Sequence, residues 1–394
     1  MTEQPISWLE TLTISDVPRV GGKNASLGEM LRTLKDKGVR VPEGFATTAA
    51  AFREYVAAND IEAELRTRIG AMKSGKATQH ETGEAIRRLF LDAEFPEPIA
   101  EAIREAYREL SRRGDQREVS VAVRSSATAE DLPQASFAGQ QETFLNVRGE
   151  RALLDACRRC YASLFTDRAI SYRDTQGFDH LEVALSIGVQ RMVRSDLAGS
   201  GVMFSIDTET GFPGVAVISA AWGLGETVVQ GAVDPDKYLV FKPLLGDGRA
   251  APIIEKTLGA KETKMVYATG GSTRTATVAT TQRERRAFVL DEAEILELGR
   301  WAATIEDRYG RPMDMEWAKD GETGELHMVQ ARPETVQSSR QTGQFKTYRL
   351  KQKGEPILTG SAIGQAIAAG PVCANRSAAD IDRFRDGAIL VPGG

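Results

Sequence analysis

Two carboxylates, an amide and a guanidinium recur at alternate positions in a short stretch near residue 320. Asp314 and Glu316 lie two residues apart in MDMEW, and Gln330 and Arg332 lie two apart in VQARP. Carboxylate oxygens are ligands that Mg²⁺ prefers beside phosphates, and a guanidinium matches phosphate oxygens through paired hydrogen bonds. These residue types therefore suit a metal-bound polyphosphate.

The stretch 312–333 predicts a two-stranded hairpin that would bring these side chains together. Alternation in the first strand sends the two methionines and Trp317 to one face and both carboxylates to the other. A turn rich in Asp, Gly and Thr reverses the chain at residues 320–324. If the register places Asp314 near Gln330, all four polar groups converge on one patch. The alternative is a solvated hairpin in which acid and arginine only pair across the strands.

A lysine lies in a second stretch with the composition of an anion site. Residues 18–31, PRVGGKNASLGEML, combine a Gly-Gly turn, Lys23 and an amphipathic run. Free N–H groups and the helix dipole favour anions at a helix start, so Lys23 is a candidate phosphate contact. The Walker A spacing is absent, and such a turn is often only the entry to a helix.

The densest set of small hydrogen-bond donors lies between residues 119 and 147. A β-type run, VSVAV, ends at Arg124 and is followed by hydroxyl residues, an acidic pair and a glycine-containing loop before a second strand, TFLNV. Small residues let the backbone approach phosphates closely. A phosphate-cradling loop is favoured over a plain surface loop. Its candidate residues are Arg124, Ser125, Ser126, Gly139, Gln140, Gln141 and Thr143.

Two further segments could contact the nucleoside part of such a ligand. VALSIGVQRMV predicts a buried strand with Gln190 near its end, after which Met192 and Val193 could pack on a purine. Core packing is the alternative for Met192. In GLGETVVQ, Glu226 could accept hydrogen bonds from a ribose or assist a cation, or it could cap the next segment as a first-turn acid.

Helical patterns surround these segments. Residues 150–175 predict one helix, and DEAEILELGRWAATIEDRYG predicts an amphipathic helix that Asp291 caps and Gly310 ends. Cys157 and Cys160 form a C-x-x-C inside the first of these patterns. Three cysteines are too few for a disulfide framework, and we interpret this pair as reduced helix residues rather than a redox or zinc site.

Length and composition bound the class of protein. A chain of 394 residues suggests two or three domains, and 41% hydrophobic with 27% charged residues is an ordinary globular profile. No apolar run of membrane-spanning length and no signal-peptide pattern occur, so we expect a cytoplasmic location and no membrane partner. The net charge of −5 argues against a general nucleic-acid binder.

Together these motifs resemble the nucleotide-binding part of the phosphoenolpyruvate synthase family, the pyruvate, water dikinases. Pyruvate, phosphate dikinase and rifampicin phosphotransferase are relatives with the same architecture. The resemblance covers residues 20–336, and its 26-residue central motif is highly specific. It rests on VGGKNASLGEM, AVRSSATAEDLPQASFAGQQETFLNV, SLFTDRAISYR, GLGETVVQGAVDPDKY, MDMEWAKDG and VQARPETV.

The resemblance implies an α+β fold of the ATP-grasp type, with ATP and Mg²⁺ between two subdomains at residues 1–195 and 196–337. Residues 338–394 would be a linker and the incomplete start of a swivelling phosphohistidine domain. Matching motif positions implies that Lys23, Arg124 and Arg332 stabilise the charge on the phosphates, that Asp314 and Glu316 hold the metal, and that Gln330 completes the polyphosphate site. Gln190, Met192 and Val193 match the adenine hinge.

One departure concerns the phosphate-carrying histidine, which the family holds in a Thr-Cys-His-Ala motif. The chain has only His80, His180 and His327, none in that neighbourhood, and strand alternation predicts that His327 faces away from the carboxylates. We therefore expect ATP binding without turnover of pyruvate by this chain alone, since pyruvate would bind to absent downstream domains. A homodimer of the full-length enzyme stays open.

Two alternatives to a synthase remain at this stage. The chain could be the nucleotide domain of another phosphohistidine-dependent enzyme, of the rifampicin phosphotransferase or pyruvate, phosphate dikinase type. It could also be a non-catalytic ATP-binding fragment.

Overall fold

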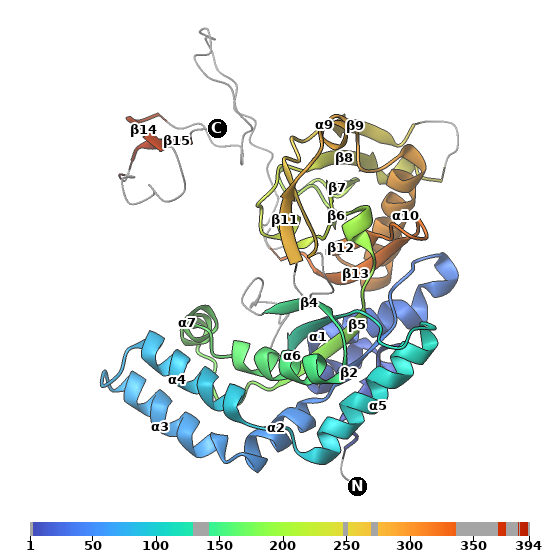
Figure 1. Ribbon diagram of the computed structural model, residues 1–394. Helices are drawn as coiled ribbons and strands as arrows, with labels where there is room; N and C mark the ends of the chain where they lie inside the picture. Colours follow the sequence, from blue (N-terminus) through green and yellow to red (C-terminus); the bar gives the residue numbers. More distant parts are fainter. Residues whose placement is uncertain are drawn as a thin grey trace.

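Two β-sheets and the helices packed on them make up most of the molecule (Figure 1). The computed structural model describes residues 3–128, 142–246, 251–268, 275–335, 369–375, 385 and 387–392. Helices and strands are mixed throughout, as expected for the α+β class. Within the described residues no helix is both long and apolar enough to span a membrane.

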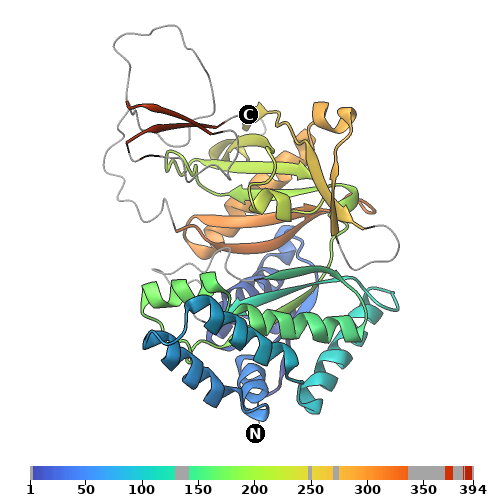
Figure 2. The same ribbon diagram turned by 60° about the vertical axis from the view of Figure 1, so that its left-hand side comes forward.

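The first sheet has five antiparallel strands in the order β1-β2-β5-β3-β4. These are β1 (Ile6–Trp8), β2 (Gly44–Thr47), β3 (Val121–Ala127), β4 (Thr143–Val147) and β5 (Leu185–Arg191). One face buries alternate residues of the central strands, such as Val121 and Val123 of β3, in an apolar core. The helices on that side are α2 (Ala49–Ala58), α3 (Ile61–Lys73), α4 (Gln79–Asp92), α5 (Glu97–Arg113), α6 (Glu150–Ser163) and α7 (Asp167–Gln176). Both views place them on the side of this sheet away from the second sheet (Figures 1 and 2).

The second sheet has six antiparallel strands in the order β13-β12-β6-β7-β8-β9. They are β6 (Gly199–Phe204), β7 (Val215–Trp222), β8 (Asp236–Phe241), β9 (Ile253–Thr257), β12 (Met313–Lys319) and β13 (Leu326–Pro333). Short elements flank this sheet: α8 (Glu226–Val229), α9 (Gln282–Arg286) and the ribbon of β10 (Thr263–Tyr267) with β11 (Thr275–Ala279). Farther along the chain, β14 (Val372–Asn375) and β15 (Ile389–Pro392) form a parallel pair.

Helix α10 (Glu292–Tyr309) packs against one face of the second sheet, and its ends follow the expected signals. Asp291 accepts a hydrogen bond from the N–H of Glu294, whose side chain reciprocates in a capping box, and Gly310 ends the helix with φ +65°. Met315 and Trp317 of β12 are fully buried in the same core as Ile295 of α10. The hairpin prediction is therefore confirmed, with the methionines and tryptophan on the core face.

Two local predictions need correction. Residues 150–175 form two helices rather than one, because the hydroxyl of Thr166 accepts a hydrogen bond from the N–H of Ala169 and starts α7 separately. Strand β3 also continues to Ala127 instead of ending at Arg124, since it stays paired with β5 over that length.

Helix α1 (Val17–Thr33) lies between the two sheets and contacts both β3 and β13. Its residues Val20, Leu27 and Met30 belong to the core beneath the second sheet. The Ser26 hydroxyl donates to the carbonyl of Ala331 on β13 at 2.8 Å. The chain passes from the first sheet to the second between residues 191 and 199, but the helix that packs against both sheets comes from the start of the chain.

Gly21 interrupts α1 and allows it to approach β3. Its backbone has φ +74° and ψ 163°, a conformation that essentially only glycine adopts. A Cβ atom at this position would lie 2.2 Å from the Ser126 hydroxyl and 2.5 Å from the Ser126 carbonyl oxygen. Gly21 is thus required both for the backbone conformation and for the close contact with β3.

We predict that Gly21→Ala lowers the free energy of unfolding by about 2 to 4 kcal/mol, because it adds backbone strain and overpacks the contact with Ser126. Urea denaturation checks this. Gly38→Ala is the matched control: Gly38 also has a positive φ of +82°, but nothing lies within 4 Å of its added Cβ, so only about 1 kcal/mol should be lost. Equal losses in the two variants would show that the approach to Ser126 is unimportant.

Candidate nucleotide-binding site

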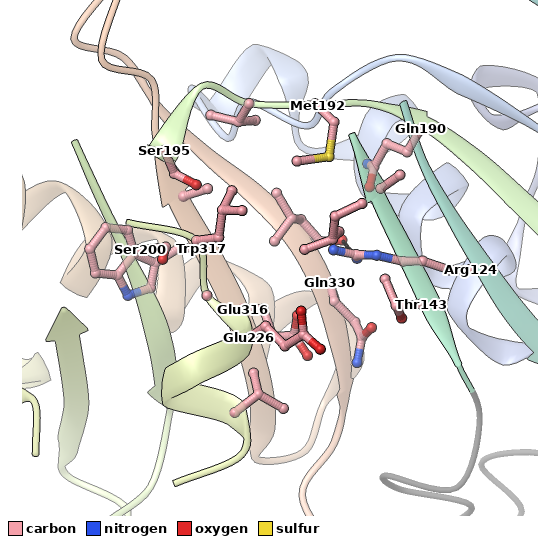
Figure 3. A pocket seen from close by; sticks show the side chains of 18 of the residues that line it. Arg124, Thr143, Gln190, Met192, Ser195, Ser200, Glu226, Glu316, Trp317 and Gln330 are labelled. Atoms are coloured by element: carbon pink, nitrogen blue, oxygen red, sulfur yellow. Dashed lines mark hydrogen bonds between the residues drawn. The ribbon is translucent and has the colours of Figure 1, made fainter. Parts of the chain in front are cut away.

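A cleft of about 830 Å³ lies between the two sheets and is lined by residues of both. Figure 3 shows side chains from β3, β4 and β5 facing those from β12, β13 and the segment after β7. Eight residues singled out from the sequence line it: Arg124, Thr143, Gln190, Met192, Val193, Glu226, Glu316 and Gln330.

The hairpin register differs from the one considered above. Glu316 lies opposite Gln330, and Asp314 lies opposite Arg332 rather than near Gln330. A bulge follows Glu316, where Trp317 pairs with Met328 and leaves Val329 as an extra residue on β13. Val329 and Gln330 both line the cleft as a result.

In this register Arg332 forms an ion pair with Asp314. The Nε and Nη2 atoms of Arg332 donate to Oδ2 of Asp314 at 2.8 and 2.6 Å, and neither side chain is among those that line the cleft. Burial raises the pKa of Asp314 above its ordinary value of 3.8, and Arg332 offsets this effect only in part. Nearby Glu316 and Glu334 raise the pKa further.

Glu316 is different, because its carboxylate faces the cleft and has no hydrogen bond or ion pair with any residue that the structure describes. It is thus available to a ligand. Over the described part of the chain, no cluster of three His, Cys, Asp or Glu side chains is arranged to hold a metal ion.

Arg124 crosses the space between the sheets. Its Nη1 donates to the carbonyl oxygen of Val329 on β13 at 3.0 Å. The Nε atom is buried and has no hydrogen-bond partner in the described structure. The guanidinium is therefore anchored at one nitrogen.

Lys23 lies beside the same strand but outside the cleft wall. Its amine donates to the backbone carbonyl of Ser125 at 3.4 Å, one residue from Arg124. Ser125 itself follows Arg124 on β3, so alternation turns its buried hydroxyl to the opposite face. Three other predicted loop residues, Gly139, Gln140 and Gln141, lie outside the described residues.

The predicted hinge segment lines part of the cleft. Gln190 is buried and its amide donates to the carbonyl of Pro42 at 3.2 Å. The N–H of Met192 donates to the carbonyl of Ser120 at 2.9 Å, which fixes the chain as it leaves β5. Met192 and Val193 then line the cleft.

Glu226 begins α8, as predicted for a first-turn acid, and it also lines the cleft. Gln230, one turn later, donates to Oε1 of Glu226 at 3.0 Å. The preceding turn is held by the Ser200 hydroxyl, which donates to the carbonyl of Gly223 at 2.6 Å. The carboxylate is therefore oriented by its own helix.

Arg168 is a cleft residue that the sequence reasoning missed. It lies in the first turn of α7, is exposed, and has no ion pair with the residues that the structure describes. A signal was present. Many helical arginines of this chain pair with an acid three or four positions away, whereas Arg168 has Leu164, Phe165, Ser171 and Tyr172 at those positions.

The expectation for His327 was wrong. Ala318 lies on the carboxylate face of β12 and pairs with His327, so the two share that face. The bulge at Val329 reverses the alternation that the sequence implied. Burial lowers the pKa of His327 below its ordinary value of 6.5.

Comparison with known protein families shows the family to which this chain belongs. Residues 17–352 match the family described as pyruvate phosphate dikinase, AMP/ATP-binding domain, and the chain belongs to this family.

Curated relatives named phosphoenolpyruvate synthase are similar along nearly the whole chain. The protein from Synechocystis is 53% identical over 98% of this chain and 48% of its own length. Those from Escherichia coli (51% identical, 98% and 48%) and Pseudomonas aeruginosa (50% identical, 99% and 49%) are comparable. The chain spans about half the length of the curated relatives it matches.

The raised pKa of Asp314 predicts a pH-dependent contribution to stability. The folded state holds this proton more tightly than the unfolded state, so the contribution is present below pH 3.8 and is lost as pH rises through the folded pKa. The stability of the native chain relative to Asp314→Asn should therefore fall as the pH rises from 3.8 through the folded-state pKa. Urea denaturation of both chains without Mg²⁺ measures the difference, and an advantage that grows with pH contradicts the assignment.

Proposed function

We propose that the cleft binds ATP with Mg²⁺, in an ATP-grasp type arrangement of two subdomains at residues 1–195 and 196–337. One observation carries the proposal: Arg124 and Thr143 from the first sheet face Glu316 and Gln330 from the second across a single cleft. These groups come from segments about 200 residues apart in sequence. The family to which the chain belongs is described as AMP/ATP-binding.

The two ends of the cleft suit the two ends of ATP. Met192 and Val193 present apolar atoms and backbone groups for a base, while Glu226 is placed for a ribose hydroxyl. Arg124 and Arg168 supply guanidinium groups for phosphates, with Lys23 close behind β3. Gln330 adds an amide beside Glu316.

The carboxylates of the hairpin fit a magnesium ion. Glu316 has no partner among the described residues, and Arg332 uses only Oδ2 of Asp314, which leaves Oδ1 as a further oxygen ligand. Mg²⁺ usually binds through one or two carboxylates together with substrate phosphates and water. When bound, the ion would neutralise phosphate charge, while Arg332 orients Asp314 and Arg124 orients the phosphate chain.

For the whole reaction, we propose that the chain is the ATP-binding part of a phosphoenolpyruvate synthase. Such an enzyme uses ATP and water to convert pyruvate to phosphoenolpyruvate, AMP and phosphate through a phosphohistidine. The identity of about half to relatives of that name supports this assignment. Phosphoryl transfer depends on positioning and charge stabilisation, which this cleft is built to supply.

Glu316→Gln tests the nucleotide site. Mg-ATP at about 100 times its Kd stabilises a folded protein by about 2.7 kcal/mol, so the melting temperature of the native chain should rise by several degrees. The variant should lose most of that shift, because an amide is a poor magnesium ligand. Glu325→Gln, an exposed change on the same hairpin, should keep it. A full shift in Glu316→Gln would remove this residue from the metal site.

The products distinguish the candidate reactions. We expect a fusion of this chain to the C-terminal half of the Escherichia coli relative to release AMP and inorganic phosphate over many turnovers only when pyruvate is present, because without pyruvate the phosphohistidine can form only once per enzyme. A pyruvate, phosphate dikinase would form pyrophosphate instead, and a non-catalytic fragment would form no AMP. Quantifying AMP, phosphate and pyrophosphate in one assay separates these outcomes.

A further inference from the structure

The turn between β12 and β13 forms hydrogen bonds with the segment in which the chain passes from the first sheet to the second. The N–H of Gly321 donates to the carbonyl oxygen of Arg194 at 3.1 Å. The N–H of Arg194 donates to Oδ2 of Asp320 at 3.2 Å. Both backbone polar groups of Arg194 are thus held by the turn, at the residue directly after Val193.

The Arg194 side chain reinforces this contact. Its Nε and Nη2 donate to Asp196 at 2.9 and 3.1 Å, and its Nη1 donates to Glu322 of the turn at 2.7 Å. The guanidinium also lies over the ring of Tyr267, 5.2 Å from its centroid. The chain is therefore fixed on the second-sheet side by several groups at once.

The other end of the same segment is fixed to the first sheet. The N–H of Arg191 donates to the carbonyl of Glu43, and the N–H of Met192 donates to the carbonyl of Ser120, each at 2.9 Å. Met192 and Val193 lie between these hydrogen bonds and the hydrogen bonds that the turn forms with Arg194. Their position in the cleft depends on both anchors.

We infer that Asp320 is a positioning residue for base recognition: it acts through Arg194 to hold Met192 and Val193 at the base end of the cleft. The inference rests on the proposed function, because it takes these two residues as base contacts. The hairpin whose turn contains Asp320 also carries Glu316, which the proposed function assigns to the phosphates and their metal ion. One rigid hairpin thereby sets the distance between the base and phosphate contacts.

The two oxygens of Asp320 have separate tasks, which makes a selective variant available. Oδ1 accepts the N–H groups of Glu322 and Thr323 at 2.8 and 3.0 Å and shapes the turn. Oδ2 accepts the N–H of Arg194. In Asp320→Asn, the amide oxygen can keep the turn bonds while the NH₂ group cannot accept from Arg194.

The experiment compares the Kd values for ATP and for inorganic tripolyphosphate, both with Mg²⁺, by titration calorimetry on the whole chain. For Asp320→Asn we expect the Kd for ATP to rise about fivefold, equivalent to about 1 kcal/mol, while the Kd for tripolyphosphate stays unchanged. The preference for ATP over ITP should shrink as well, because the base is held less firmly.

A second variant and a control make the test independent of one substitution. In Gly321→Ala the new Cβ would lie 2.4 Å from Cβ of Leu197. This overlap forces the turn away from the segment that contains Arg194, so the same selective loss is expected. Glu325→Gln is the control, because it changes an exposed carboxylate of the same hairpin that lies 3.9 Å from His327 rather than beside Arg194, and it should keep both Kd values.

Three outcomes would overturn the inference. Unchanged ATP affinity in Asp320→Asn and Gly321→Ala would show that the hydrogen bonds between the turn and Arg194 do not position the base contacts. Equal losses for ATP and tripolyphosphate would indicate a general structural role. A native chain that binds ATP no better than tripolyphosphate would refute the base site itself, whereas a native chain that binds neither would refute the proposed function.

Discussion

The cleft exists because α1 is packed between the two sheets. Its apolar residues complete the core beneath the second sheet, while Gly21 brings its backbone against Ser126 of the first. Burial of apolar surface is the dominant favourable term in folding and is stronger than any single polar contact here. The helix therefore fixes the separation of β3 from β13, and the single bond from Arg124 to Val329 can span it.

The β12–β13 hairpin contributes side chains to the cleft and also contacts the segment that joins the two sheets. Its strands carry Glu316 and Gln330, and its turn holds Arg194. Its core face is anchored by Trp317, which is fully buried. A buried aromatic side chain contributes a large packing energy, so the polar face of the hairpin is held on a rigid support. A functional group placed on such a strand is positioned more accurately than one on a free loop.

Local sequence signals predicted the elements well where each signal acts within one element. Asp291 and Gly310 marked the ends of α10, and the alternation in MDMEW assigned both faces of β12. These predictions succeed because capping and pleating depend on neighbouring residues only. The boundary at Thr166 was missed because a helical pattern on both sides concealed a new N-cap.

The site was harder to predict because it depends on contacts between distant segments. The bulge at Val329 changes the partner of Asp314 and the face of His327, and no local pattern marks it. The location of Lys23 against the carbonyl of Ser125 likewise follows from the packing of α1 on β3. Eight candidates nevertheless line one cleft. Five of them lie in motifs that carry the resemblance, and the other three, Gln190, Met192 and Val193, come from VALSIGVQRMV.

The charges on the cleft wall explain why a cation belongs to the proposed site. Among the described residues that line it, Arg124, Arg168 and Arg191 are balanced by Glu142, Glu226 and Glu316. Such a wall cannot by itself neutralise a triphosphate chain. The carboxylates would repel the phosphates at short range, where a low dielectric strengthens the interaction. A divalent ion held by Glu316 would supply charge of the opposite sign and would offset this repulsion in the proposed site.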